Sequence, residues 1–283
     1  MVRYLYVSPV GTSLLQNLAR RRRDLVEKYS SYRLGDWSRL PLDDPMNKVP
    51  DGYVCQVVRG HEVYEALLSM ALEDPRGSSA ELNGLLGIAS LYNHSRSDAE
   101  VLLYKTRSCT SRLCSSVVAE ALRRLGFAAV QEVEVRAMAS PDEFEEGLVE
   151  ILDKVVRAVA SARGRGLRVC VNATPGFKAE TTFFVIASLL AGADAVLYIH
   201  DSFREPVILP TIPIAPRTEE VEKLMKVFGG GDVAPLHALY QEGLSEEELR
   251  RYRDMGLIEV REGAARIRTW VRKMLELLAE ARG

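Results

Sequence analysis

Three short segments combine glycine with hydroxyl, amide or cationic side chains and could bind a phosphate-bearing ligand. The first is Gly11-Thr12-Ser13, which follows a short apolar stretch and opens an amphipathic one. Glycine permits a tight turn and a close approach of a ligand, and the free N–H groups at a helix start favour phosphate. The two hydroxyls could equally serve as ordinary helix caps. We take Gly11, Thr12 and Ser13 as candidate ligand contacts.

The second segment is Asn-Ala-Thr-Pro-Gly-Phe-Lys at residues 172–178. Its amide and hydroxyl groups supply donors and acceptors, and its glycine permits close approach. Lys178 in the first turn of an expected helix opposes the positive end of the helix dipole. A residue that breaks a local rule at a strand exit is a functional candidate, and the alternative is a solvated lysine. The candidate contacts here are Asn172, Thr174, Gly176, Phe177 and Lys178.

The third segment is Lys-Thr-Arg-Ser-Cys-Thr-Ser-Arg at residues 105–112. Arginine and hydroxyl side chains suit contact with a phosphate. A helix cap surrounded by surface charges would look similar, so both interpretations stay open. The candidate contact in this segment is Arg107.

The pattern along residues 1–214 alternates strands and helices, which predicts an α/β fold with a mainly parallel sheet and helices on both faces. Ligands of such sheets bind beyond the carboxyl ends of the strands, and all three segments follow an expected strand. A long loop is expected at 33–53. We expect strands at 4–8, 99–104, 128–135, 167–171, 195–200 and, at an edge, 207–214; we expect helices at 12–28, 61–72, 79–92, 110–125, 140–163 and 176–190.

Residues 217–283 change character and predict a second, smaller domain after a linker at 214–216. Ser245 followed by Glu248 is a strong capping signature for a helix. Three helices, a short hairpin and a closing helix are typical of a winged helix-turn-helix. The expected helices are 219–228, 233–241, 245–256 and 269–281, and the expected strands are 257–260 and 265–267.

Composition and missing motifs exclude several classes of protein. The formal net charge of −2 gives no global basic field for nucleic acid, and no apolar run is long enough to span a bilayer. The sequence lacks a phosphate loop, a Gly-x-Gly-x-x-Gly turn and a Gly-x-Ser-x-Gly elbow, which disfavours an ATPase, a dehydrogenase and a hydrolase. The four cysteines form no Cys-x-x-Cys pair. We therefore expect four free thiols in a cytoplasmic protein.

Together the motifs resemble the CRISPR-associated Rossmann-fold (CARF) family. The resemblance rests on Gly11-Thr12-Ser13 and on residues 172–180, which end in Gly-Phe-Lys-Ala-Glu, and it covers about residues 1–214. Such proteins bind cyclic oligoadenylates. The chain lacks their Arg-x(4–6)-His ribonuclease motif and carries a winged-helix-like tail, as archaeal ring nucleases do. One departure is Pro175, which stands where the family often has glycine and has no N–H to donate.

The resemblance implies that the protein binds cyclic tetra-adenylate and cleaves it. Attack by the ribose 2′-hydroxyl on its neighbouring phosphorus would need no metal or other cofactor. The four-fold symmetry of the ring fits a two-fold protein axis, so we expect a homodimer. Ser13 and Lys178 take the roles of the family's catalytic serine and lysine. The alternative is a transcription regulator that senses the ring without cutting it and binds DNA through the winged helix. DNA is not the favoured partner, because residues 217–283 hold 12 basic and 13 acidic side chains.

Overall fold

The computed structural model describes residues 2–136, 141–176, 178–199, 205–209, 211, 218–229 and 231–282. Its centre is a six-stranded sheet with the order β3-β2-β1-β4-β5-β6. The first five strands pair in parallel and β6 pairs antiparallel with β5 at the edge, which confirms the expected α/β fold. No helix in these ranges is long and apolar enough to cross a membrane. The strands are β1 (Tyr4–Pro9), β2 (Ala99–Thr106), β3 (Ala129–Val135), β4 (Arg168–Asn172), β5 (Ala195–Ile199) and β6 (Pro206–Leu209).

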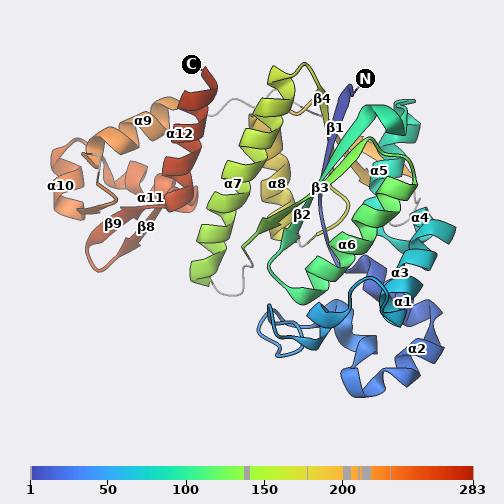
Figure 1. Cartoon of the computed structure of the whole chain (residues 1–283). Coiled ribbons are helices and arrows are strands. Elements are labelled where there is room, and N and C mark those ends of the chain that lie inside the picture. Colours follow the sequence, from blue (N-terminus) through green and yellow to red (C-terminus); the bar gives the residue numbers. More distant parts are fainter. Residues whose placement is uncertain are drawn as a thin grey trace.

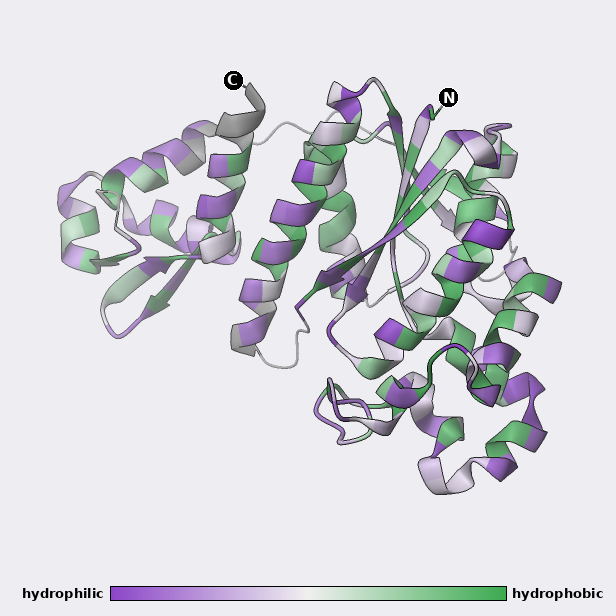
Figure 2. Cartoon of the chain, viewed as in Figure 1, coloured by the Kyte–Doolittle hydropathy of each residue, from purple (hydrophilic) through white to green (hydrophobic). Residues whose placement is uncertain are grey.

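Helices cover both faces of this sheet (Figure 1). Alternate residues of a strand point to opposite faces. Tyr6 therefore packs in the core shared with α1, α3, α5 and α6, whereas Leu5 and Val7 pack with α7 and α8. Figure 2 shows the hydrophobic faces of these helices turned toward the strands. The helices are α1 (Ser13–Arg21), α2 (Arg23–Lys28), α3 (Glu62–Glu73), α4 (Pro75–Ser78), α5 (Ala80–Leu91), α6 (Cys109–Arg124), α7 (Pro141–Gly164) and α8 (Lys178–Leu190).

The order of the strands reverses between β1 and β4. The chain leaves β1 toward β2 and β3 on one side, and leaves β4 toward β5 on the other. The connections at this point diverge, and ligands of such sheets bind in the crevice beyond the carboxyl ends of two strands at such a point. Two of the three candidate segments, residues 11–13 and 172–178, follow these two strands directly.

The C-terminal part has its own sheet and its own core. Strands β7, β9 and β8 form an antiparallel sheet around a cluster that includes Leu239, Tyr252 and Ile267. The capping box at Ser245 and Glu248 is confirmed at the start of α11. The order of helices and strands agrees with the pattern on which the winged-helix prediction rests. The elements are α9 (Thr218–Val227), β7 (Val233–Pro235), α10 (Leu236–Gln241), α11 (Glu246–Asp254), β8 (Ile258–Arg261), β9 (Ala264–Ile267) and α12 (Thr269–Arg282).

Helix α12 lies against α7, one of the helices that cover the larger sheet (Figure 1). Leu277 packs in the core formed with α7 and α8, while Val271 packs in the C-terminal core. Lys273 forms an ion pair with Asp153 of α7 at 3.0 Å. One helix therefore joins the two cores.

Three sequence expectations need correction. The single helix expected at 12–28 is broken at Arg22, which has φ −116° and ψ 67°. The loop expected at 33–53 contains a 3-10 helix at Leu34–Arg39 that buries Trp37. Residues 233–235, expected to be helical, form β7 instead, because they pair with β9 and the residue before Pro235 is disfavoured in a helix. The part of the edge strand expected at 210 and 212–214 lies outside the described residues.

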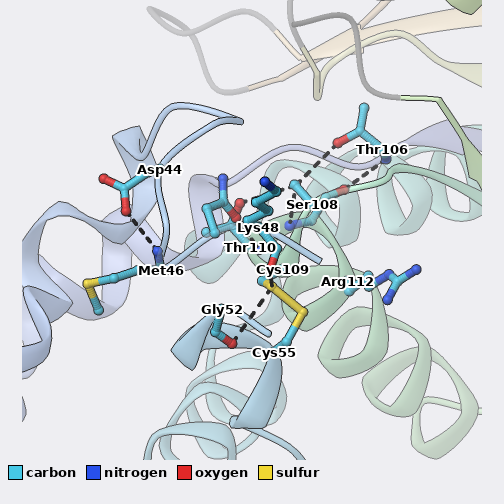
Figure 3. The surroundings of a disulfide bond; sticks show 12 residues. Asp44, Met46, Lys48, Gly52, Cys55, Thr106, Ser108, Cys109, Thr110 and Arg112 are labelled. Atoms are coloured by element: carbon cyan, nitrogen blue, oxygen red, sulfur yellow. Dashed lines mark hydrogen bonds between the residues drawn. A yellow bond between two sulfur atoms is a disulfide. The ribbon is translucent and has the colours of Figure 1, made fainter. Parts of the chain in front are cut away.

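The expectation of four free thiols is wrong for two of the cysteines. Cys55 and Cys109 form a disulfide, while Cys114 and Cys170 are free and buried (Figure 3). The two bonded cysteines are 54 positions apart, so spacing carried no signal. The loop that precedes Cys55 is bound to the start of α6: the backbone carbonyl of Asn47 accepts the Cys109 N–H at 3.0 Å. This loop therefore folds back on the start of α6 and brings the two sulfur atoms together.

Reduction of this disulfide is expected to lower the free energy of unfolding by about 2–4 kcal/mol, because the bond closes a long loop in the unfolded chain. Chemical denaturation with and without dithiothreitol measures the difference. A Cys55→Ser variant is the control, since its lowered stability should not respond to the reductant. An identical midpoint for the oxidised and reduced wild-type protein would contradict the expectation.

Candidate functional site

The turn after β1 is bound to the start of α5. The Gly11 N–H donates to Glu81 Oε1 at 2.7 Å. Ser13 Oγ accepts the Ala80 N–H at 3.0 Å and donates to Glu81 Oε2 at 3.4 Å. Thr12 points elsewhere, because its hydroxyl donates to the Ser38 carbonyl at 2.9 Å. Of the two neighbouring hydroxyls, Ser13 is the one that lies beside the buried acid.

The turn after β4 is held by its own polar side chains. Asn172 is fully buried, and its amide nitrogen donates to Ser8 Oγ at 3.0 Å. Its carbonyl oxygen accepts the Thr174 N–H at 3.2 Å, and the Thr174 hydroxyl accepts the Ile199 N–H at 3.0 Å. Both side chains therefore fix the backbone between β4 and β5. Phe177, the remaining candidate contact here, lies outside the described residues.

The two turns touch through a pair of glycines. A side chain placed on Gly11 would bring its Cβ within 3.1 Å of the Gly176 nitrogen. Gly176 has φ +100°, a backbone conformation that favours glycine. Ser13 and Lys178 each lie two residues beyond this contact. The structure thus brings together the turns that carry the two residues predicted to be catalytic.

Lys178 is the first residue of α8 and its side chain is exposed. It borders a shallow groove of about 370 Å³ that α8 forms with Leu148 of α7. The groove is largely apolar, because Thr182 is the one polar residue among its other described lining residues. These are Leu148, Ala179, Thr182, Phe183 and Ile186.

Arg107 lies in a different hollow of about 590 Å³, together with Lys48 and Arg136. Acidic residues line the same hollow, and Arg107 itself lies 3.9 Å from Glu134. Among the residues that the structure describes, the hollow that Arg107 lines and the groove that Lys178 borders have no lining residue in common.

The start of α6 is already occupied by protein groups. The Thr110 N–H donates to Asn47 Oδ1 at 2.9 Å, and the Ser111 N–H donates to Ser108 Oγ at 3.2 Å. A helix start binds phosphate through such N–H groups. A phosphate at residues 105–112 would have to displace Asn47, so the helix-cap interpretation of this segment has the better support.

Glu81 is a member of the site that the sequence did not reveal. The carboxyl group is fully buried in the first turn of α5. Burial raises the pKa of Glu81, and hydrogen bonds from Ser79, Gly11 and Ser13 oppose that rise. An acid in the first turn of a helix is common, so residue type and spacing gave no signal. Only the folded chain places this carboxyl group beneath the Gly11–Ser13 turn.

Glu180, two residues after Lys178, should make the free energy of unfolding depend measurably on pH. Burial raises the pKa of Glu180 to about 6. A raised folded-state pKa stabilises the fold most at low pH, and the contribution is lost as the pH rises through about 6. Relative to Glu180→Gln, the wild type should lose about 1 kcal/mol of unfolding free energy between pH 4.5 and 7, measured by urea denaturation.

The control for this measurement is Glu62→Gln, for which the sign is opposite. A hydrogen bond from Lys28 lowers the pKa of Glu62, so the wild type should gain stability over that variant as the pH rises. A Glu180→Gln difference that stays constant over the same pH interval would contradict the assigned shift.

Residues 76–212 of the chain match a protein-family model. The family is described as CRISPR-associated protein (Cas_APE2256). The match spans just under half of the chain and includes Glu81, Asn172 and Lys178, whereas Ser13 lies before it. It supports a CRISPR-associated protein family for this chain.

Proposed function

We propose that this protein is a ring nuclease that binds cyclic tetra-adenylate at the β1–β4 crevice and opens it to linear di-adenylates. The observation that carries the proposal is the contact between Gly11 and Gly176, because it places the turns of Ser13 and Lys178 at the point where the strand order reverses. Gly176 is exposed and has no side chain, so a phosphate can approach its backbone closely. The CRISPR-associated family match agrees with a signalling ligand of that system.

The reaction needs no nucleophile from the protein. The ribose 2′-oxygen forms a bond to its neighbouring phosphorus while the bond from phosphorus to the 5′-oxygen breaks. The 2′-hydroxyl loses its proton to water and the departing 5′-oxygen takes one from water, which leaves a 2′,3′-cyclic phosphate. The protein holds the 2′-oxygen in line with the leaving oxygen. Lys178 stabilises the added negative charge on the pentavalent phosphorus.

A homodimer fits the symmetry of this ligand. A ring of four identical nucleotides has a two-fold axis, and an isologous dimer has one as well. Each subunit contributes one Ser13 and one Lys178, so each ring is cut twice. This stoichiometry accounts for di-adenylates as the final products.

The alternative function, a DNA-binding regulator, depends on free arginines in the C-terminal part. Arg250 forms an ion pair with Glu246, Arg261 pairs with Glu259, and Arg268 pairs with Glu145 at 3.2 Å. Arginines with carboxylate partners offer less charge to phosphates of DNA. These pairs favour the nuclease over the regulator. DNA affinity that falls steeply with salt would reverse this preference.

Equilibrium titration tests the binding step. Purified Lys178→Ala protein, in which the proposed cleavage is suppressed, is titrated with cyclic tri-, tetra- and hexa-adenylate and with linear tetra-adenylate, in parallel with measurement of mass in solution. The proposal expects the tetra-adenylate ring to bind most tightly, with one ring per two chains. A monomer that binds one ring tightly, or a protein that binds no ring, would refute it.

A further inference from the structure

The hydroxyl of Ser13 has two protein partners with opposite roles. The Ala80 N–H can only donate and lies 3.0 Å from Ser13 Oγ. On the other side, the carboxyl group of Glu81 accepts: its Oε2 takes the hydrogen of Ser13 at 3.4 Å. A serine hydroxyl has one hydrogen and two lone pairs. With the hydrogen and one lone pair engaged, Ser13 has a single acceptor position left for a ligand.

The carboxyl group of Glu81 is fixed in the orientation that this arrangement needs. Oε1 accepts the Gly11 N–H at 2.7 Å, and Oε2 accepts the Ser79 hydroxyl at 2.5 Å. Ser79 is itself held as the cap of α5, because its oxygen accepts the Leu82 N–H. The carboxyl is fully buried among these donors and cannot turn away without leaving one of them unpaired.

We infer that Glu81 is a positioning residue that makes Ser13 an acceptor, so that Ser13 binds the ribose 2′-hydroxyl of the ligand and not a phosphate oxygen. An ionised phosphate oxygen offers no hydrogen and would face the remaining lone pair of Ser13. A 2′-hydroxyl offers the hydrogen that this lone pair accepts. The inference rests on the proposed function for the identity of the ligand.

Such a contact orients the nucleophile. When the 2′-hydroxyl donates to Ser13, the lone pairs of the 2′-oxygen are left to face the neighbouring phosphorus. Lys178 then acts on the phosphate while Ser13 acts on the ribose, which divides two tasks between two side chains. Glu81 acts only through Ser13 and the Gly11 turn, since it has no exposed atoms of its own.

The variant Glu81→Gln should reverse the polarity of Ser13. The amide oxygen can keep the Gly11 N–H, which places the amide nitrogen toward Ser79 and Ser13. Ser13 would then receive hydrogens from both the glutamine amide and Ala80, and its own hydrogen would point toward the ligand. A Ser13 that donates its hydrogen to the ligand no longer prefers a ribose hydroxyl over a group that cannot donate a hydrogen bond.

The experiment compares two rings by equilibrium binding. One is cyclic tetra-adenylate; the other carries 2′-fluoro groups, which cannot donate a hydrogen. The parent protein is Lys178→Ala, so that the proposed cleavage is suppressed. We expect the parent to bind the hydroxyl ring about tenfold more tightly than the fluoro ring. Glu81→Gln in the same background should bring this ratio to about one or invert it.

The matched control is Glu73→Gln, which makes the same substitution in another serine–glutamate pair (Ser69 Oγ to Glu73 Oε1, 2.5 Å) on the exposed side of α3. Its ratio should equal that of the parent. If Glu81→Gln fails to fold, Ser13→Ala removes the hydroxyl but keeps the hydrogen bonds of Glu81 to Gly11 and Ser79, and its ratio should also fall to about one.

The outcomes separate the two claims. If the parent binds neither ring, the proposed function fails. If the parent binds both rings equally, or if the tenfold preference survives in Glu81→Gln or in Ser13→Ala, the inference is overturned while the proposed ligand stands.

Discussion

Lys178→Ala is expected to open cyclic tetra-adenylate about 100- to 1000-fold more slowly than the wild type, with a much smaller change in affinity. The reason is that charge develops on the phosphorus oxygens only as the 2′-oxygen attacks. A cation placed at the start of α8 therefore stabilises the transition state more than the bound ring. Single-turnover cleavage rates, measured beside equilibrium binding, separate the two effects.

Lys226→Ala is the matched control for this variant. Lys226 is also an exposed lysine at a helix end, but it belongs to α9 in the C-terminal part. Its removal should leave the cleavage rate unchanged. An equal loss of rate in both variants, or an affinity loss that accounts for the whole effect of Lys178→Ala, would contradict the assigned role.

Gly84→Ala is expected to destabilise the protein by about 1–3 kcal/mol, although alanine is the better helix former. Gly84 lies in the middle of α5, where helix propensity alone predicts that alanine stabilises by about 1 kcal/mol. A Cβ at this position would overlap the side-chain amide of Asn172. Because Asn172 is fully buried and holds the turn after β4, the strain should reach the site.

Thermal and urea unfolding measure the stability effect, and ring binding measures its consequence for the site. Gly164→Ala is the control, because Gly164 also lies in a helix and a Cβ there meets no atom within 4 Å. The control should be neutral or slightly stabilising. If Gly84→Ala were stabilised as much as Gly164→Ala, the close packing of α5 on Asn172 would be wrong.

The sequence carried most of the information about the sheet. Alternating apolar runs and helical periods predicted the five parallel strands of the larger sheet to within about two residues, because buried parallel strands are nearly continuous apolar segments. The prediction failed where tertiary pairing overrode local preference. Residues 233–235 became a strand because β9 pairs with them.

The site was predictable only in part. Glycines and hydroxyls at strand exits identified the Gly11 and Gly176 turns, since position along the chain fixes which edge of the sheet they reach. Glu81 was missed because its role depends on burial beneath another segment, about 70 residues away in the chain. The disulfide was missed for the same reason, since nothing in the spacing of Cys55 and Cys109 shows that the loop folds back onto α6.

The most direct test of the central claim is incubation of the purified protein with cyclic tetra-adenylate in excess EDTA, with the products resolved by chromatography over time. The proposed mechanism predicts conversion of the ring to linear di-adenylates with 2′,3′-cyclic phosphate ends. A ring that remains intact while it co-elutes with the protein would contradict the nuclease function and leave a sensor.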